Sequence, residues 1–201
     1  SINLNRVSDS LFFATGLAPF NKGLYFKWDR MANTKEWVEY YPETKRRYEG
    51  DLSFLYRSII VVNRDKEFVI CGLYYFNKIL VFDFQGNILK DIQVGDKSFE
   101  PVMEDFEILR YSEDTESFFL SVKGSGNYFY CLWNRNEVDI DQHERKNSKI
   151  FVFDWNLNHV STVQTDHVLE EFDVDPYNQY FLGLVSNEEE DTGIYKFDLE
   201  L

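Results

Sequence analysis

Short apolar runs of about six residues, separated by polar turns, follow one another along most of the chain. One run recurs. Ile150–Trp155 reads Ile-Phe-Val-Phe-Asp-Trp, and similar runs begin at Ile79, at Ile194 and, more loosely, at Tyr25. Each copy is an apolar or aromatic strand that ends in an aromatic residue followed by Asp. Four such copies in one chain indicate a repeat protein.

Polar turn signals lie between the runs, among them Asn63–Lys66, Gln85–Asn87 and Gly124–Gly126. This succession of strand and turn is typical of an antiparallel meander. Residues 44–56 are expected to form a connecting loop. Besides the four copies, the pattern predicts strands at residues 2–7, 11–14, 36–41, 58–62, 67–75, 88–94, 106–110, 118–122, 128–133, 159–164, 168–174 and 179–185.

The repeated strands are apolar at successive positions, whereas a half-buried strand alternates apolar and polar residues. A blade packed between two neighbouring blades is apolar on both faces. The sequence therefore predicts an all-β fold, a single β-propeller domain over residues 1–201 built of four-stranded antiparallel blades, of which about four are visible. The aspartates that end the copies are expected to accept hydrogen bonds from the following turns. They are Asp29, Asp83, Asp154 and Asp198.

Composition and net charge indicate which classes of binding partner the protein suits. Aromatic residues make up 18% of the chain, and the net charge is -14. That charge disfavours nucleic acid as a partner, because binding phosphates needs a basic face. It also disfavours anionic membranes, and it suits a cationic ligand or a metal ion. No apolar run reaches the roughly 18 residues that a membrane-spanning helix needs.

Cys71 and Cys131 lie in apolar runs and not in a metal-ligand spacing. They are expected to be buried small side chains. A disulfide between them is the alternative if the protein is exported.

Several motifs, in their order along the chain, resemble the TolB-like six-bladed propeller lipoproteins of Bacteroidetes. They are Tyr40–Pro42, Tyr128–Trp133, Ile150–Trp155 and Phe172–Asp175. The resemblance implies a periplasmic or cell-surface propeller, lipid-anchored in the full-length protein, with no established activity and so no catalytic residues to carry over. The lipidated Cys and first blade of that family are not seen before Ser1.

The last predicted blade lacks an outer strand. Residues 2–7 could supply it and close the ring. Alternatively, blades precede Ser1 and the chain is a fragment of a six-bladed ring. The resemblance favours the second arrangement.

Few residues in the sequence suggest a catalytic or metal-binding site. Asp139, Asp141, His143 and Glu144 lie in one polar loop where carboxylates could meet a cation, but the loop lacks the Gly of a calcium loop. A solvated acidic loop is therefore favoured, as it is for the charge run Glu188–Asp191. Neighbours on a strand face opposite ways, which argues against an Asp166–His167 dyad; neither His159 nor His167 has a nucleophile nearby in sequence. No metal site and no cofactor is predicted.

The best ligand-site candidate is the point where a packed strand enters the long polar loop. It comprises Tyr130, Trp133, Asn134 and Arg135, with Arg57 and Arg110 as secondary candidates. Aromatic faces beside an Arg make a common recognition surface. The alternative is that these aromatic residues merely pack between blades.

Two functions fit the sequence. The first is a non-catalytic binding or scaffold propeller of the cell envelope, whose partner is a protein, a peptide or a glycan. The second is a metal-dependent hydrolase or lyase acting at the mouth of the propeller channel. No motif for nucleophilic, zinc-dependent or phosphate chemistry supports the second.

Overall fold

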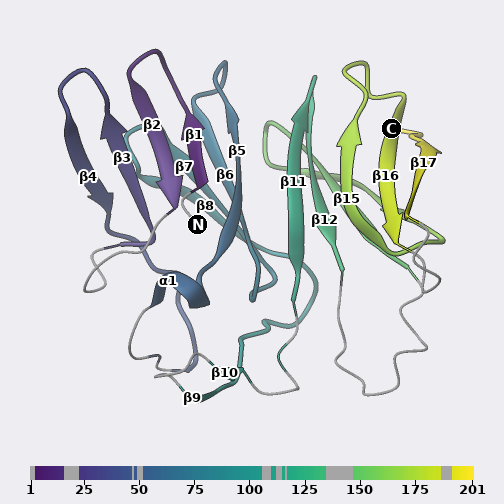
Figure 1. Cartoon of the computed structure of the whole chain (residues 1–201), viewed down its shortest axis with the longest axis horizontal. Coiled ribbons are helices and arrows are strands. Elements are labelled where there is room, and N and C mark those ends of the chain that lie inside the picture. Colours follow the sequence, from purple (N-terminus) through teal and green to yellow (C-terminus); the bar gives the residue numbers. More distant parts are fainter. Residues whose placement is uncertain are drawn as a thin grey trace. The chain divides into compact units, whose positions relative to one another are not determined.

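A computed structural model describes residues 3–15, 23–46, 48, 52–105, 110–111, 115, 117–134, 147–186 and 192–201. These residues form antiparallel strands and one short helical turn (Figure 1). Contacts divide the chain into two compact units, Ser1–Glu116 and Ser117–Leu201.

The first unit holds two four-stranded sheets in which strands that follow one another in sequence are neighbours. The strands of the first sheet are β1 (Asn3–Arg6), β2 (Leu11–Thr15), β3 (Tyr25–Asp29) and β4 (Thr34–Val38). Those of the second are β5 (Ser58–Asn63), β6 (Phe68–Leu73), β7 (Lys78–Asp83) and β8 (Ile88–Gln93). A helical turn, α1 (Leu52–Leu55), precedes β5, and a small hairpin of β9 (Met103–Asp105) and β10 (Arg110–Tyr111) follows β8.

The second unit repeats the arrangement. One sheet has the order β11 (Phe119–Ser125), β12 (Tyr128–Trp133), β13 (Lys149–Asp154) and β14 (His159–Gln164). The other has, among the described residues, β15 (Leu169–Val174), β16 (Tyr180–Ser186) and β17 (Thr192–Asp198). Each copy of the repeated run forms the third strand of its sheet, as β3, β7, β13 and β17. The predicted all-β fold of antiparallel blades is confirmed.

Each unit has a core between its two sheets. In the first, Phe13 and Tyr25 of one sheet pack with Leu80 and Phe82 of the other. In the second, Ile150 and Val152 of β13 pack with Phe172 and Phe181. Strand β7 is buried on both faces, since every residue from Ile79 to Phe82 is 0% exposed. This agrees with the expectation for a strand inside a stack of blades.

Strand β17 departs from that expectation. Ile194 is 73% exposed, whereas Ile79 and Ile150, which open their copies in the same way, are 0% exposed. Among the described residues nothing covers the face of β17 that carries Ile194. The same face carries Lys196 where the other copies have Val81 or Val152, and its ammonium lies 4.5 Å from the centroid of the Tyr180 ring. The prediction that every repeated strand is buried on both faces is therefore wrong for β17.

The strand predicted at residues 36–41 ends early, at Val38. The following tyrosines leave the sheet because their rings pack elsewhere: the Tyr40 ring lies 5.7 Å from Phe82, and the Tyr41 ring lies 5.7 Å from Tyr56. The segment predicted as a loop from 44 to 56 contains α1, whose Leu55 is buried.

Gly124 and Ser125 belong to β11, so the turn begins at Gly126 and not at Gly124. The strand predicted at residues 106–110 falls largely outside the described residues. Residues 3–6 pair with β2 as the edge strand of the first sheet, not with β17 as the alternative for ring closure would require.

Cys71 and Cys131 are free thiols and are fully buried, as expected. Burial raises the pKa of both thiols, so each stays protonated at neutral pH. In the described part of the chain, no helix is both long enough and apolar enough to span a membrane.

Candidate binding groove

Two of the predicted site residues, Tyr130 and Asn134, are held inside the second unit. The Tyr130 hydroxyl donates to Oδ1 of Asn178 at 2.8 Å, and burial raises its pKa. Asn134 is 6% exposed and donates from Nδ2 to the carbonyl of Leu169 at 2.6 Å. Its Oδ1 accepts from the Ser148 hydroxyl. Both side chains thus join β12 to neighbouring segments.

Trp133 lies between two other aromatic rings. Its centroid is 6.0 Å from that of Phe118 and 5.1 Å from that of Phe151. Among the described residues, the indole Nε1 is buried without a hydrogen-bond partner. The alternative in which these aromatic residues pack within the fold accounts for the contacts that Tyr130 and Trp133 make with the described residues. A ligand role for them stays a prediction.

The other candidates lie elsewhere. Arg57 is exposed in the first unit, with its guanidinium 4.9 Å from the centroid of the Tyr74 ring. Arg110 belongs to β10. Arg135 lies outside the described residues, as do the acidic loop from Asp139 to Glu144 and the run from Glu188 to Asp191.

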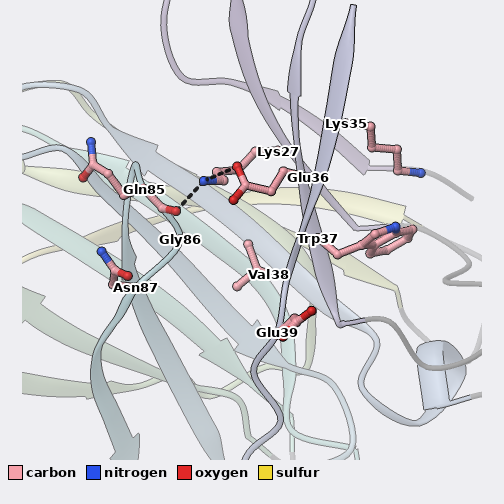
Figure 2. Close-up of a pocket in the computed structure, with 9 residues that line it drawn as sticks. All are labelled: Lys27, Lys35, Glu36, Trp37, Val38, Glu39, Gln85, Gly86 and Asn87. Carbon is pink, nitrogen blue, oxygen red and sulfur yellow. Dashed lines mark hydrogen bonds and ion pairs between the residues drawn. The ribbon is translucent and has the colours of Figure 1, made fainter.

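The structure instead shows an open groove within the first unit, of about 720 Å³. It runs along the edge strand β4 and is walled by the turn between β7 and β8 (Figure 2). Its lining is mostly polar. The nine lining residues are Lys27, Lys35, Glu36, Trp37, Val38, Glu39, Gln85, Gly86 and Asn87.

Lys27 ties the two walls of the groove together. Its ammonium lies 2.9 Å from a carboxylate oxygen of Glu36 and donates to the carbonyl of Gln85 at 2.5 Å. The Lys27 side chain is 14% exposed, whereas that of Glu36 is 74% exposed. The lysine charge is therefore used within the structure, and much of the glutamate carboxylate faces solvent.

The turn that forms the second wall is built around Asp83 and Gly86. Asp83 accepts from the backbone and side-chain nitrogens of Asn87, both at 2.8 Å. Burial alone would raise the pKa of Asp83, but these hydrogen bonds outweigh it and lower the pKa. Gly86 has φ +89, and a Cβ there would lie 2.8 Å from Cγ2 of Val38. The turn thus packs closely against β4.

On the other face of β4, Lys35 covers the aromatic rings. Its ammonium lies 3.8 Å from the centroid of Phe26 and 4.3 Å from that of Trp37. The two rings meet edge to face at 5.3 Å. A cation held over an aromatic face in this way is stabilised by the ring quadrupole. Lys35 and Trp37 point away from Lys27 and Val38 in Figure 2.

Sequence reasoning missed this groove. One signal was available: Lys27 is a charged residue at the position where the copies in β7 and β13 have Val81 and Val152. A polar residue at a position that is apolar in the other copies indicates that the structure or function of the repeat differs there.

The repeated four-stranded antiparallel sheets, with the same motif on each third strand, define the class as a β-propeller. The chain belongs to the family of TolB-like six-bladed propellers, whose model matches residues 4–177. The resemblance seen in the sequence motifs is thereby confirmed for the family.

Solved structures show the same fold. A member of the DUF4221 family from Bacteroides vulgatus aligns with a TM-score of 0.65 and 11% identity, over 98% of this chain and 64% of that one. The Dos1 propeller aligns with a TM-score of 0.51 and 13% identity, over 98% and 58%. Dihydro-heme d1 dehydrogenase NirN aligns with a TM-score of 0.53 and 12% identity, over 98% and 34%.

This chain therefore spans less than two thirds of the length of these proteins. At such low identity the likeness concerns the fold alone. No protein of curated function matches the chain.

Proposed function

We propose that the protein is a non-catalytic binding or scaffold propeller of the cell envelope, whose partner is a protein, a peptide or a glycan. The observation that carries this proposal is the groove beside β4. It is open, about 720 Å³ in volume, and lined by charged, amide and aromatic side chains. Such surfaces suit recognition, since polar groups on a rigid scaffold fix the orientation of a ligand.

The envelope location draws support from two findings. The motifs of the chain resemble envelope lipoproteins, and the family match covers residues 4–177.

The alternative, a metal-dependent hydrolase or lyase, needs carboxylates or histidines that converge. In the part of the chain that the structure describes, no group of three or more His, Cys, Asp or Glu side chains is placed to hold a metal ion. The observations in hand therefore favour binding over catalysis.

Binding is tested by screening the purified protein against arrays of envelope glycans and of peptides, with calorimetry on each positive probe. Saturable binding without chemical change of the probe is expected. The same probes are incubated with the protein plus Zn²⁺, Mn²⁺ or Ca²⁺ and analysed by mass spectrometry. Metal-dependent cleavage of a probe, blocked by a chelator, would contradict the proposal and establish the enzyme.

A further inference from the structure

Strand β4 is the edge of its sheet, because it stands last in the order β1-β2-β3-β4. An edge strand presents backbone N–H and C=O groups that another chain can pair with. Extended peptides use such edges by adding themselves as a further strand. The groove lies directly beside this edge, so the two features form one surface.

The outer strands β8 and β14 differ from β4. Each pairs with its neighbour through a register shift, between Val81 and Phe82 for β8 and between Val152 and Phe153 for β14. Such irregularities twist an edge and discourage pairing. Strand β4 pairs with β3 in unbroken register, from Asp29 with Thr34 to Tyr25 with Val38. Of these three outer edges, β4 is the regular one.

A lysine on an edge strand usually protects it from pairing. Lys35 is held over Phe26 and Trp37 instead, at 3.8 and 4.3 Å from their centroids. Its charge therefore lies against one face of the sheet and not across the edge.

The side chains of an added strand would alternate between the two faces of the sheet. On one face they would enter the groove, because Lys27 and Glu36 form a cross-strand pair on that side and Gly86 packs against Val38. The groove is thus placed to take every second side chain of a bound strand.

Charge decides what those side chains would be. Lys27 is paired with Glu36 and is only 14% exposed, whereas Lys35 keeps its positive charge but lies over the aromatic rings on the other face of β4. Glu39 is exposed, and no hydrogen bond or ion pair joins it to another described residue. The whole chain carries a net charge of -14. Apart from Lys35, the exposed charges that line the groove are therefore the carboxylates of Glu36 and Glu39, and they suit a Lys or Arg side chain.

The groove beside β4 suits a glycan less well than a peptide. Sugars bind proteins by stacking on an open aromatic face, and the Trp37 ring has Lys35 over one face and Phe26 at its edge. We propose that β4 and its groove bind an extended, Lys- or Arg-bearing peptide as an additional strand. This proposal rests on the binding function proposed above and names its ligand class.

The probe is an acetylated, amidated octapeptide in which Val or Thr alternates with Lys. Two versions carry N-methyl groups on every second backbone nitrogen, one in each phase, and a fourth has Glu in place of Lys. Amide hydrogen exchange of the protein should slow over residues 34–39 when the parent peptide is added, and stay unchanged over residues 159–164 in the shifted edge β14. At least one methylated phase should bind at least about tenfold more weakly, because main-chain pairing supplies much of the affinity.

The protein variant is Glu39→Gln, which removes an exposed charge with no described partner. It should weaken binding of the Lys peptide roughly two- to fivefold and reduce its salt dependence. Asp65→Asn removes an exposed carboxylate in the turn between β5 and β6 that likewise has no described partner; it is the matched control and should leave binding unchanged.

Three results would overturn the inference: no binding of the Lys peptide at about 1 mM, equal binding of all N-methylated versions, or protection that maps away from β4. If glycans or peptides bind elsewhere on the protein, the proposed binding function stands and the β4 inference fails. If no probe binds and metal-dependent turnover is found, the proposed function itself fails.

Discussion

The aspartate that ends each repeated strand acts on the backbone of the next turn. Asp154 accepts from the amides of Asn156 and Asn158 at 2.9 and 2.8 Å. Asp29 accepts from the amides of Met31 and Ala32 in the same way. The structural role predicted for these aspartates is confirmed where a hairpin turn follows. Asp198 differs, since its described partner is Lys196 at 3.2 Å.

Replacing Asp154 should therefore cost more than replacing Asp198. We expect Asp154→Ala to lower the free energy of unfolding by about 1 kcal/mol, because two turn amides lose a charged acceptor. Asp198→Ala should change it by less than about 0.5 kcal/mol. Urea unfolding at pH 7 measures both. Equal losses of unfolding free energy in the two variants would show that the hydrogen bonds from the turn amides to Asp154 do not stabilise the protein.

The same aspartate gives the stability a pH dependence. Hydrogen bonds, chiefly from the backbone amide of Asn158, lower the pKa of Asp154 in the folded state. Its contribution is therefore complete above the unfolded-state pKa, about 3.9, and is lost as the pH falls through the folded value. The difference in stability between the parent protein and Asp154→Ala should shrink below about pH 4. Acid titration of both proteins in urea measures this, and a difference that grows at low pH would contradict it.

Buried asparagines were not recognised from the sequence as structural. Asn77 is 1% exposed, donates to the carbonyls of Val94 and Lys97 at 2.6 and 2.7 Å, and accepts from the amide of Phe99. Asn134, directly after β12, is 6% exposed and is held by Leu169 and Ser148 in a similar way. The neighbouring sequence does not identify either asparagine as structural, because its partners lie 14 to 35 positions away in the chain.

We expect Asn77→Leu to destabilise the protein by about 3 kcal/mol, since three backbone groups lose their partner. Gln93→Leu, at the exposed end of β8, is the control and should cost less than about 0.5 kcal/mol. Thermal and urea unfolding of both variants measures the difference. A cost for Asn77→Leu no larger than that of the control would refute its structural role.

At the scale of elements, the sequence located most strands within one or two residues. Apolar runs and turn residues such as Gln85–Asn87 are local signals, and antiparallel neighbours follow directly from them. The groove was not predictable in this way, because it joins residues 27–39 to residues 85–87 across two sheets. The exposure of β17 was missed for a related reason: burial depends on what covers a strand and not on its own residues.

The contact between β4 and the groove wall can be tested at Gly86. Gly86 has φ +89 and a Cβ would meet Val38, whereas Gly95 has φ +85 and nothing within 4 Å. Both Ala variants should lose about 1 kcal/mol through the backbone. Gly86→Ala should lose roughly 1 kcal/mol more, because the stiff Val38 side chain cannot move aside freely.

The double variant Gly86→Ala, Val38→Ala separates the two causes. The double variant should lose less unfolding free energy than the sum of the losses in the two single variants, because the smaller side chain at position 38 removes the clash. A double-mutant cycle of the unfolding free energies measures this difference. Equal costs of Gly86→Ala and Gly95→Ala would mean that the turn does not press on β4.

At the scale of the whole molecule, one supersecondary unit is repeated, and the chain belongs to a six-bladed propeller family. Two pairs of sheets pack face to face, one pair in each unit. In β7 and β13 the third strand is apolar at successive positions, and Ile79, Val81, Ile150 and Val152 are each 0% exposed. Strand β17 is largely exposed, and Lys196 stands where the other two strands have a valine.

The most direct test of this account is urea unfolding of Ile79→Ala, Ile150→Ala and Ile194→Ala, which change the same position in three copies of the repeat. Ile79 and Ile150 are 0% exposed and Ile194 is 73% exposed. The account predicts losses of about 2–4 kcal/mol at the first two positions and less than about 0.5 kcal/mol at Ile194. Similar losses at all three positions, or a negligible loss at Ile79 and Ile150, would contradict it.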